Sequence, residues 1–197
     1  GILPIKKYGE HSAINMFTEI SMINASPLEE FTGFTEDEVN SLCMHYQKDY
    51  NKMKNWYDGY EIGKYSIYNP KSVVESIVRN SFRNYWTSTE TYEALKDYIR
   101  LDFDGLREKV TSMIAGEKVR INTAKFQNDM TTLNSADDVL TLLVHLGYLT
   151  YGEINSMGTG EVWIPNGEVR QEFINSIEDG GWEHLMRSIN ASEEVLK

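Results

Sequence analysis

Apolar residues recur at helical spacing along much of this chain, and polar caps mark where the helices begin. The clearest start is a capping box formed by Thr35 and Glu38, which two more acidic residues in the same turn reinforce. Apolar and aromatic residues then recur every three or four positions, so the pattern predicts one helix from residue 36 through Met53. Cys43 lies on the apolar stripe of this helix and is predicted to be a core residue.

A short segment after this helix combines aromatic residues, a turn and a helix start. Asp58 and Gly59 form a strong turn signal, because glycine adopts a positive φ without steric cost. Alternating residues around Ile67 then predict a short, half-buried strand. Asn69 can cap a helix with its side-chain oxygen, and Pro70 suits the first helical position. One interpretation of this segment is a structural corner that seats one helix on another.

Four more helices are predicted outside this corner, three after it and one before it. The helix that starts at Pro70 is expected to reach about Tyr85. Its buried face is expected to hold four apolar residues: Val73, Val74, Ile77 and Val78. A second helix is predicted to start at residues 87–89, and a third over 104–115, with Gly116 as its left-handed final residue. Near the start of the chain, Ser12 fits the cap of a short helix that reaches Phe17.

The last third of the chain begins with a strand and an apolar helix. Residues 118–121 alternate as a short strand does. Ser135 and Asp138 fit a second capping box, followed by leucines and valines at helical spacing. Gly147 ends this helix.

Two strands and two helices are predicted to complete the chain. Residues 148–151 and 161–164 read as strands, joined by a glycine-containing hairpin tip over 155–160. Asn166 can cap the next helix, and a last helix is predicted over 182–189. The order of these elements favours a winged-helix-like unit.

These elements together predict a mainly α (α+β) fold. A helical, lid-like region over residues 1–115 would contain the corner, and a winged-helix-like domain with a small β-hairpin would follow over residues 116–197.

Composition and charge narrow the classes of partner and binding site expected for this chain. The chain has 197 residues and a net charge of −11, which disfavours nucleic acid as a partner because phosphates are bound chiefly by Lys and Arg. No stretch has the roughly 20 apolar residues of a membrane span, and the single cysteine fits a reducing cytoplasm. The four histidines are scattered without metal-ligand spacing, so no metal site is predicted.

A phosphate-binding loop is also not predicted. Residues 59–65 resemble one, but the spacing between the glycines is one residue short and Tyr65 stands where Mg²⁺ needs a Ser or Thr hydroxyl. We therefore expect no catalytic site and no cofactor bound by this chain alone.

Several segments resemble the AAA-ATPase-like family of bacteria and archaea, in that family's order. The corner resembles its WYDGY…YNP signature, Gly33–Val39 its GFT-x-x-EV segment, and Tyr85-Trp86 with Thr89 its YW-x-x-T segment. Gly147–Leu149 and Ile164–Arg170 resemble its GYL…IPN-x-EVR segment. Gly1–Ile5 resembles the family's LPI segment, which ends the nucleotide-binding core. The resemblance implies that this chain corresponds to the region after that core.

The resemblance implies a non-catalytic lid and winged-helix module that acts in regulation or in contact with a protein partner. The partner would be a P-loop ATPase core in cis or in trans, or a second copy of the chain, while ATP and Mg²⁺ are implied only for the full-length family. A nuclease-like domain would lie after Lys197. The candidate site residues, which would be structural or form an interface, are Trp56, Tyr57, Asp58, Gly59, Tyr60, Tyr68, Asn69, Pro70, Trp86, Gly147, Tyr148, Pro165 and Asn166.

Two alternatives stay open at this point. In the complete protein, Asp58, Tyr60, Asn69 and Pro70 would face the nucleotide if they are more than structural. The winged-helix-like unit could instead bind nucleic acid, with residues 136–146 or 167–178 as the reading helix and 153–161 as the wing.

Overall fold

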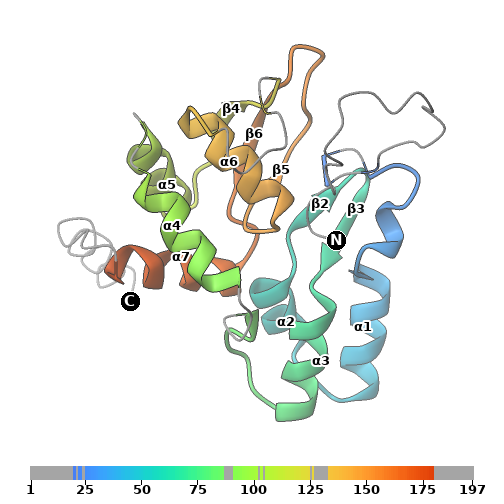
Figure 1. The fold of residues 1–197 in the computed structure, drawn as a ribbon. Coiled ribbons are helices and arrows are strands. Elements are labelled where there is room, and N and C mark those ends of the chain that lie inside the picture. Colours follow the sequence, from blue (N-terminus) through green and yellow to red (C-terminus); the bar gives the residue numbers. More distant parts are fainter. Residues whose placement is uncertain are drawn as a thin grey trace, which may run out of the picture.

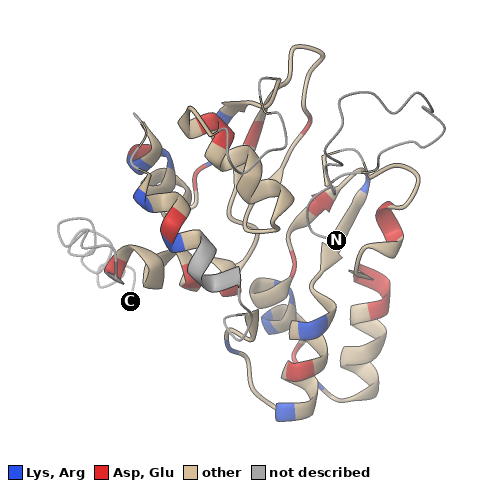
Figure 2. Ribbon diagram, in the orientation of Figure 1, with Lys and Arg blue, Asp and Glu red and all other residues tan. Residues whose placement is uncertain are grey.

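The computed structural model describes residues 20, 22–23, 25–86, 91–101, 103, 105–124, 126 and 133–179. Within these residues the fold is mixed α+β and mainly helical, as the sequence predicts. Acidic residues are distributed over the whole of it (Figure 2).

In the first part of the chain, the described residues form three α-helices, the short 3-10 helix η1 and a small sheet. Its elements are η1 (Glu29–Phe31), β1 (Phe34–Thr35), α1 (Glu36–His45), α2 (Tyr50–Tyr57), β2 (Tyr60–Ile62), β3 (Tyr65–Tyr68) and α3 (Pro70–Arg79). The sheet is antiparallel with the order β1-β3-β2, and Tyr60 lies opposite Ile67 in the β2–β3 hairpin. Figure 1 shows α1, α2 and α3 side by side at one end of this hairpin.

In the second part, the described residues form four α-helices and another small sheet. Its elements are α4 (Thr91–Arg100), α5 (Leu106–Ile114), β4 (Val119–Asn122), α6 (Ala136–His145), β5 (Thr150–Tyr151), β6 (Thr159–Trp163) and α7 (Gly167–Asp179). This sheet is also antiparallel, with the order β4-β6-β5, so the predicted hairpin between β5 and β6 is confirmed.

Two groups of buried side chains hold the described residues together. The smaller core lies among α1, α2, β3 and α3 and includes Cys43, Tyr57 and Tyr68. The larger core includes residues of α4 to α7 and both sheets, and β2 and β3 contribute Ile62 and Ile67 to it. Side chains from both sides of residue 115 therefore share the larger core, while the division of the chain at that residue stays a prediction.

The helix predicted from residue 36 through Met53 is two helices, so that prediction is wrong. The capping box of Thr35 is present, but α1 ends at His45 and Gln47 takes a positive φ of 53°. The N–H of Lys48 turns back to bond the carbonyl of Cys43. Asp49 then caps α2 by accepting a hydrogen bond from the N–H of Lys52. The apolar spacing continued across this break because both helices face the same core.

The helix at Pro70 begins as predicted but is shorter. Asn69 caps it and Pro70 is its first residue, yet it ends at Arg79 because Asn80 is left-handed. Val74 and Val78 are 46% and 75% exposed, so their predicted burial is wrong. The buried face holds Ser72, Val73 and Ser76 instead. Hydrophobic periodicity missed the two serines because their hydroxyls have partners inside the protein.

The remaining predicted helix caps and helix ends agree with the structure only in part. The side chain of Ser135 accepts from the N–H of Asp138, but the Asp138 carboxylate bonds the N–H of Asn134, so the second capping box is only half formed. Gly116 and Gly147 have positive φ values after their helices, as predicted. The predicted helices at residues 12–17 and 182–189, and the helix start at 87–89, lie outside the described residues.

Candidate functional site

Signature residues from four distant segments, together with Ser72 of α3, meet where the two cores adjoin. We call this meeting point the joint, and its residues are Asp58, Gly59, Tyr60, Ser72, Tyr85, Trp86, Gly147, Tyr148, Pro165, Asn166 and Glu168. Apart from the cap that Asn166 gives α7, the contacts described below link residues far apart in the sequence.

The turn at Asp58 and Gly59 packs directly on the segment that starts α7. The side-chain amide of Asn166 donates a 2.8 Å hydrogen bond to the backbone carbonyl of Asp58. The side-chain oxygen of Asn166 also caps α7 through the N–H of Val169. Gly59 has a φ of 104°, and a Cβ placed on it would lie 2.1 Å from the carbonyl oxygen of Pro165. Only glycine fits here, for reasons of both backbone conformation and space.

Aromatic residues form the second set of contacts. The hydroxyl of Tyr60 donates a 2.9 Å hydrogen bond to the carbonyl of Gly147. The rings of Trp86 and Tyr148 lie 4.7 Å apart, and Tyr148 meets Phe173 of α7 edge to face. Burial raises the pKa of Tyr60 well above its usual range, so its hydroxyl stays protonated and acts as a donor.

A buried carboxylate organises the joint from α7. Glu168 is 1% exposed and accepts hydrogen bonds from the Ser72 hydroxyl at 2.7 and 2.9 Å. The backbone N–H groups of Tyr85 and Trp86 donate to it at 2.6 and 3.1 Å. Burial raises the pKa of Glu168, and these hydrogen bonds oppose that rise. Glu168 thus ties α3 and the segment before α4 to α7.

A second acid, Glu172, lies one turn further along α7. It is 2% exposed, and one of its oxygens accepts a 2.8 Å hydrogen bond from Asn84. Burial raises the pKa of Glu172 to about 7; the Asn84 hydrogen bond and the charge of Lys96 oppose the rise, while Glu168 adds to it. Its other oxygen has no hydrogen-bond partner among the described residues.

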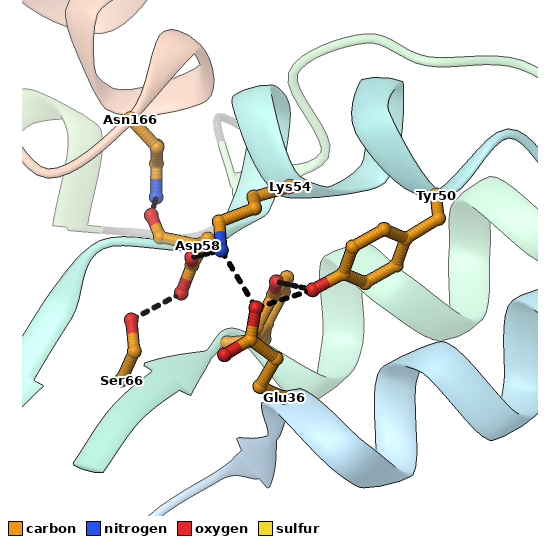
Figure 3. Close-up of polar contacts among 7 residues, drawn as sticks. Glu36, Tyr50, Lys54, Asp58, Ser66 and Asn166 are labelled. Carbon is orange, nitrogen blue, oxygen red and sulfur yellow. Dashed lines mark hydrogen bonds and ion pairs between the residues drawn. The ribbon is translucent and has the colours of Figure 1, made fainter.

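On the outer side of the corner, Asp58 takes part in a polar network (Figure 3). Ser66 donates a 2.6 Å hydrogen bond to its carboxylate, and Lys54 lies 3.9 Å from the other oxygen. Lys54 also bonds Glu36 at 2.6 Å, and Tyr50 donates to the same Glu36 oxygen. The hydrogen bond from Lys54 is the main cause that lowers the pKa of Glu36. These contacts hold α1, α2 and the β2–β3 hairpin together.

The remaining signature residues lie in or beside the smaller core. Tyr57 is buried, and its hydroxyl both donates to the carbonyl of Arg83 and accepts from its N–H. Tyr68 is buried with its hydroxyl 3.3 Å from that of Tyr50. Trp56 is half-buried against the same core and lies beside Gly167. These positions fit a structural role.

A cavity of about 230 Å³ opens beside the joint and is lined largely by signature residues. Its lining comprises Met22, Thr32, Tyr60, Ile62, Ile67, Tyr68, Asn69, Pro70, Trp86 and Gly147. The side-chain oxygen of Asn69 accepts from two N–H groups of α3, and the hydroxyl of Thr32 bonds the carbonyl of Glu29. These two polar groups on the wall are thus bonded within the chain, and most of the lining surface is apolar.

Sequence reasoning missed the acids that hold the joint. Glu168 lies inside the segment resembling IPN-x-EVR, yet it was not singled out because an acid in the first turn of a helix usually only complements the helix dipole. The available signal was the spacing: Glu168 and Glu172 are one turn apart beside the apolar positions Val169 and Phe173. That spacing places both acids next to the buried face.

Among the described residues no group of three or more His, Cys, Asp and Glu side chains is arranged to hold a metal ion. None of the described helices has the length and apolar character needed to cross a bilayer.

Comparisons with known proteins give one relative. The chain is 26% identical over 184 residues to an uncharacterized protein from the vnfD 5′ region of Azotobacter chroococcum mcd 1. The match covers 90% of this chain and 33% of the relative, so the chain spans about a third of that protein. No protein-family profile matches the chain, and no solved structure matches it.

Proposed function

We propose that this chain is a non-catalytic module of an AAA-ATPase-like protein, which contacts a protein partner in the cytoplasm and binds no ATP of its own. The observation that carries the proposal is the joint. The residues that resemble the family's signatures hold one another in place, and Asn166, Tyr60 and Tyr85 make their hydrogen bonds within the chain. Such an arrangement fits a rigid structural contact better than a catalytic site.

The hairpin geometry of residues 60–68 supports the same proposal. A phosphate-binding loop presents successive N–H groups to the ligand at the start of a helix. Here Tyr60–Ile62 pair with Tyr65–Ile67, and the N–H of Glu61 bonds the hydroxyl of Thr150. Gly59 packs closely against the carbonyl group of Pro165. The segment that resembles a phosphate loop in sequence is therefore a strand hairpin in space.

The nucleic-acid alternative has less support from the geometry. A reading helix needs an accessible face with Lys or Arg. Along α6 every residue except Asp137 is buried. The accessible residues of α7 include Gln171 and Glu178, and the loop between β5 and β6 carries Glu153. The order β4-β6-β5 with α5 and α6 packed near it is compatible with a winged-helix-like unit that contacts protein.

Isothermal titration calorimetry with ATP and Mg²⁺ tests the proposal. We expect no saturable binding by the isolated chain. Micromolar affinity would overturn the proposal, and loss of that binding in Lys64→Met but not in Lys71→Met would locate the phosphate at the hairpin. A gel shift on duplex DNA tests the alternative: salt-sensitive retardation by the chain would favour nucleic-acid binding over a protein-contact role.

A further inference from the structure

A second cavity, of about 500 Å³, lies between the two sheets and away from the joint. Its described lining comprises Ile23, Ala25, Ser26, Glu29, Glu61, Gly63, Tyr151, Gly152, Glu153 and Ile154. The two strands that bound it, β2 and β5, are both edge strands, since the sheet orders are β1-β3-β2 and β4-β6-β5. The sheets do not join: where the strands approach, the N–H of Glu61 bonds the side chain of Thr150 and not a strand backbone.

An open strand edge is a template for pairing with another chain. Gly63 and Gly152, which directly follow β2 and β5 along the chain, line the cavity beside the contact between Glu61 and Thr150. A side chain of Glu29 packs over Gly63, with its Cγ 3.1 Å from where a Cβ would lie. The cavity is thus bordered by one residue of each edge strand, Glu61 and Tyr151, and by the side chain of Glu29 from η1.

The charged residues that line this cavity are all acidic, while Lys118 and Arg120 line a neighbouring cavity together with Glu61 and Glu153. Three of its ten described lining residues, Glu29, Glu61 and Glu153, are carboxylates, and none is Lys or Arg. Within the described part of the chain none of the three forms an ion pair. The neighbouring Lys64 lies over the ring of Tyr65, 5.1 Å from its centre. Figure 2 marks the acidic segments on η1 and β2.

Apolar and aromatic residues form part of the remaining wall, beside Ser26 and two glycines. Ile23, Ala25 and Ile154 line the cavity together with Tyr151, whose hydroxyl donates to the carbonyl of Met22. Lys and Arg side chains suit such a site, because their methylene stems bury against apolar surface while the charged group stays at a polar rim. Acidic or purely apolar segments would leave the three carboxylates unpaired or desolvated.

We infer that the cavity between β2 and β5 is a docking site for an extended, lysine- or arginine-bearing segment of a protein partner, recognised through Glu29, Glu61 and Glu153. The inference rests on the proposed function, because it supplies the partner chemistry of a protein-contact module. Strand edges would provide backbone pairing, and the carboxylates would select the basic side chains.

Fluorescence anisotropy with a labelled peptide of alternating Lys and Val residues tests the inference at low ionic strength. A matched peptide with Gln in place of every Lys serves as the ligand control. We expect the Lys peptide to bind about tenfold more tightly than the Gln peptide, because exposed ion pairs contribute modestly and add over several contacts. The double variant Glu61→Lys, Glu153→Lys should weaken binding of the Lys peptide by about tenfold or more.

The control variant is Glu108→Lys, Glu178→Lys, which changes net charge equally at exposed positions on α5 and α7. It should change affinity by less than about threefold. Equal effects of the two double variants, equal affinity for both peptides, or no peptide binding would each overturn the inference; in the last case the carboxylates serve only to keep the strand edges soluble. Glu61→Gln, Glu153→Gln provides a milder variant if charge reversal unfolds the chain, which circular dichroism would show. Nucleotide binding bears only on the proposed function, so failures of the two proposals are distinguishable.

Discussion

Replacement of Glu172 by Gln should stabilise the protein above neutral pH and leave it unchanged in acid. Glu172 is 2% exposed, and burial raises its pKa to about 7. The groups that face it are Asn84, which donates a hydrogen bond, Lys96 of α4, and Glu168 one turn away on α7. Gln has the same shape and keeps an oxygen that can accept from Asn84, but it carries no charge at any pH.

The magnitude follows from the two pKa values. In the unfolded chain the carboxyl titrates near 4.5, and in the folded protein near 7. The folded state therefore holds its proton more tightly, so stability is fully present below pH 4.5 and falls as the pH rises through 7. A difference of about 2.5 pKa units corresponds to about 3 kcal/mol, which is the gain expected for Glu172→Gln at about pH 8.

Urea unfolding followed by tryptophan fluorescence at about pH 5 and about pH 8 measures this difference. The comparison of variant with wild type isolates Glu172 from carboxyls such as Glu36, whose pKa is lowered and whose contribution has the opposite pH dependence. Glu178→Gln, at an exposed position on the same helix, should shift stability by less than about 0.5 kcal/mol at both pH values. A Glu172→Gln variant that gains nothing at the higher pH would refute the reasoning.

Two further predictions concern the joint, with thermal or urea unfolding as the measurement. Gly59→Ala places a Cβ against the carbonyl of Pro165 and should cost about 3 kcal/mol or more, whereas Gly116→Ala, which has a similar φ and open space, should cost only about 1 to 2 kcal/mol. Equal costs would show that the close approach to Pro165 is relaxed in solution. Tyr60→Phe removes the hydrogen bond to the Gly147 carbonyl and should cost about 1 kcal/mol; Tyr46→Phe, at a half-exposed position, should cost less than about 0.5 kcal/mol.

The sequence predicts those helix boundaries that are set by hydrogen bonds between near neighbours in the chain. The caps at Thr35, Asn69 and Asn166 could be read from the sequence because each bond spans only two or three residues. The left-handed Gly116 and Gly147 were predicted for the same reason. Burial on α3 could not be predicted, because whether Ser72 or Val74 faces inward depends on a partner 96 residues away from Ser72.

The candidate site likewise combines features that the sequence predicts with contacts that it does not predict. Motif resemblance located Gly59, Pro165 and Asn166 as separate features but not their mutual contact, since no periodicity relates positions 108 residues apart such as Asp58 and Asn166. Glu168 and Glu172 escaped notice because a buried acid looks like a solvated one until its partners are known. The winged-helix-like unit and the family assignment stay predictions.

The joint also explains why a recognisable sequence signature need not indicate a catalytic activity. Glycine is required at residue 59 because another backbone passes there, and Asn166 uses its two ends to cap α7 and to hold the carbonyl of Asp58. Each of these demands comes from packing, and together they couple the orientation of α7 to that of the corner. A displacement of α7 would break the bond from Asn166 and the hydrogen bonds that Ser72, Tyr85 and Trp86 donate to Glu168 at once, so we expect the two cores to move as a unit unless a partner disrupts this joint.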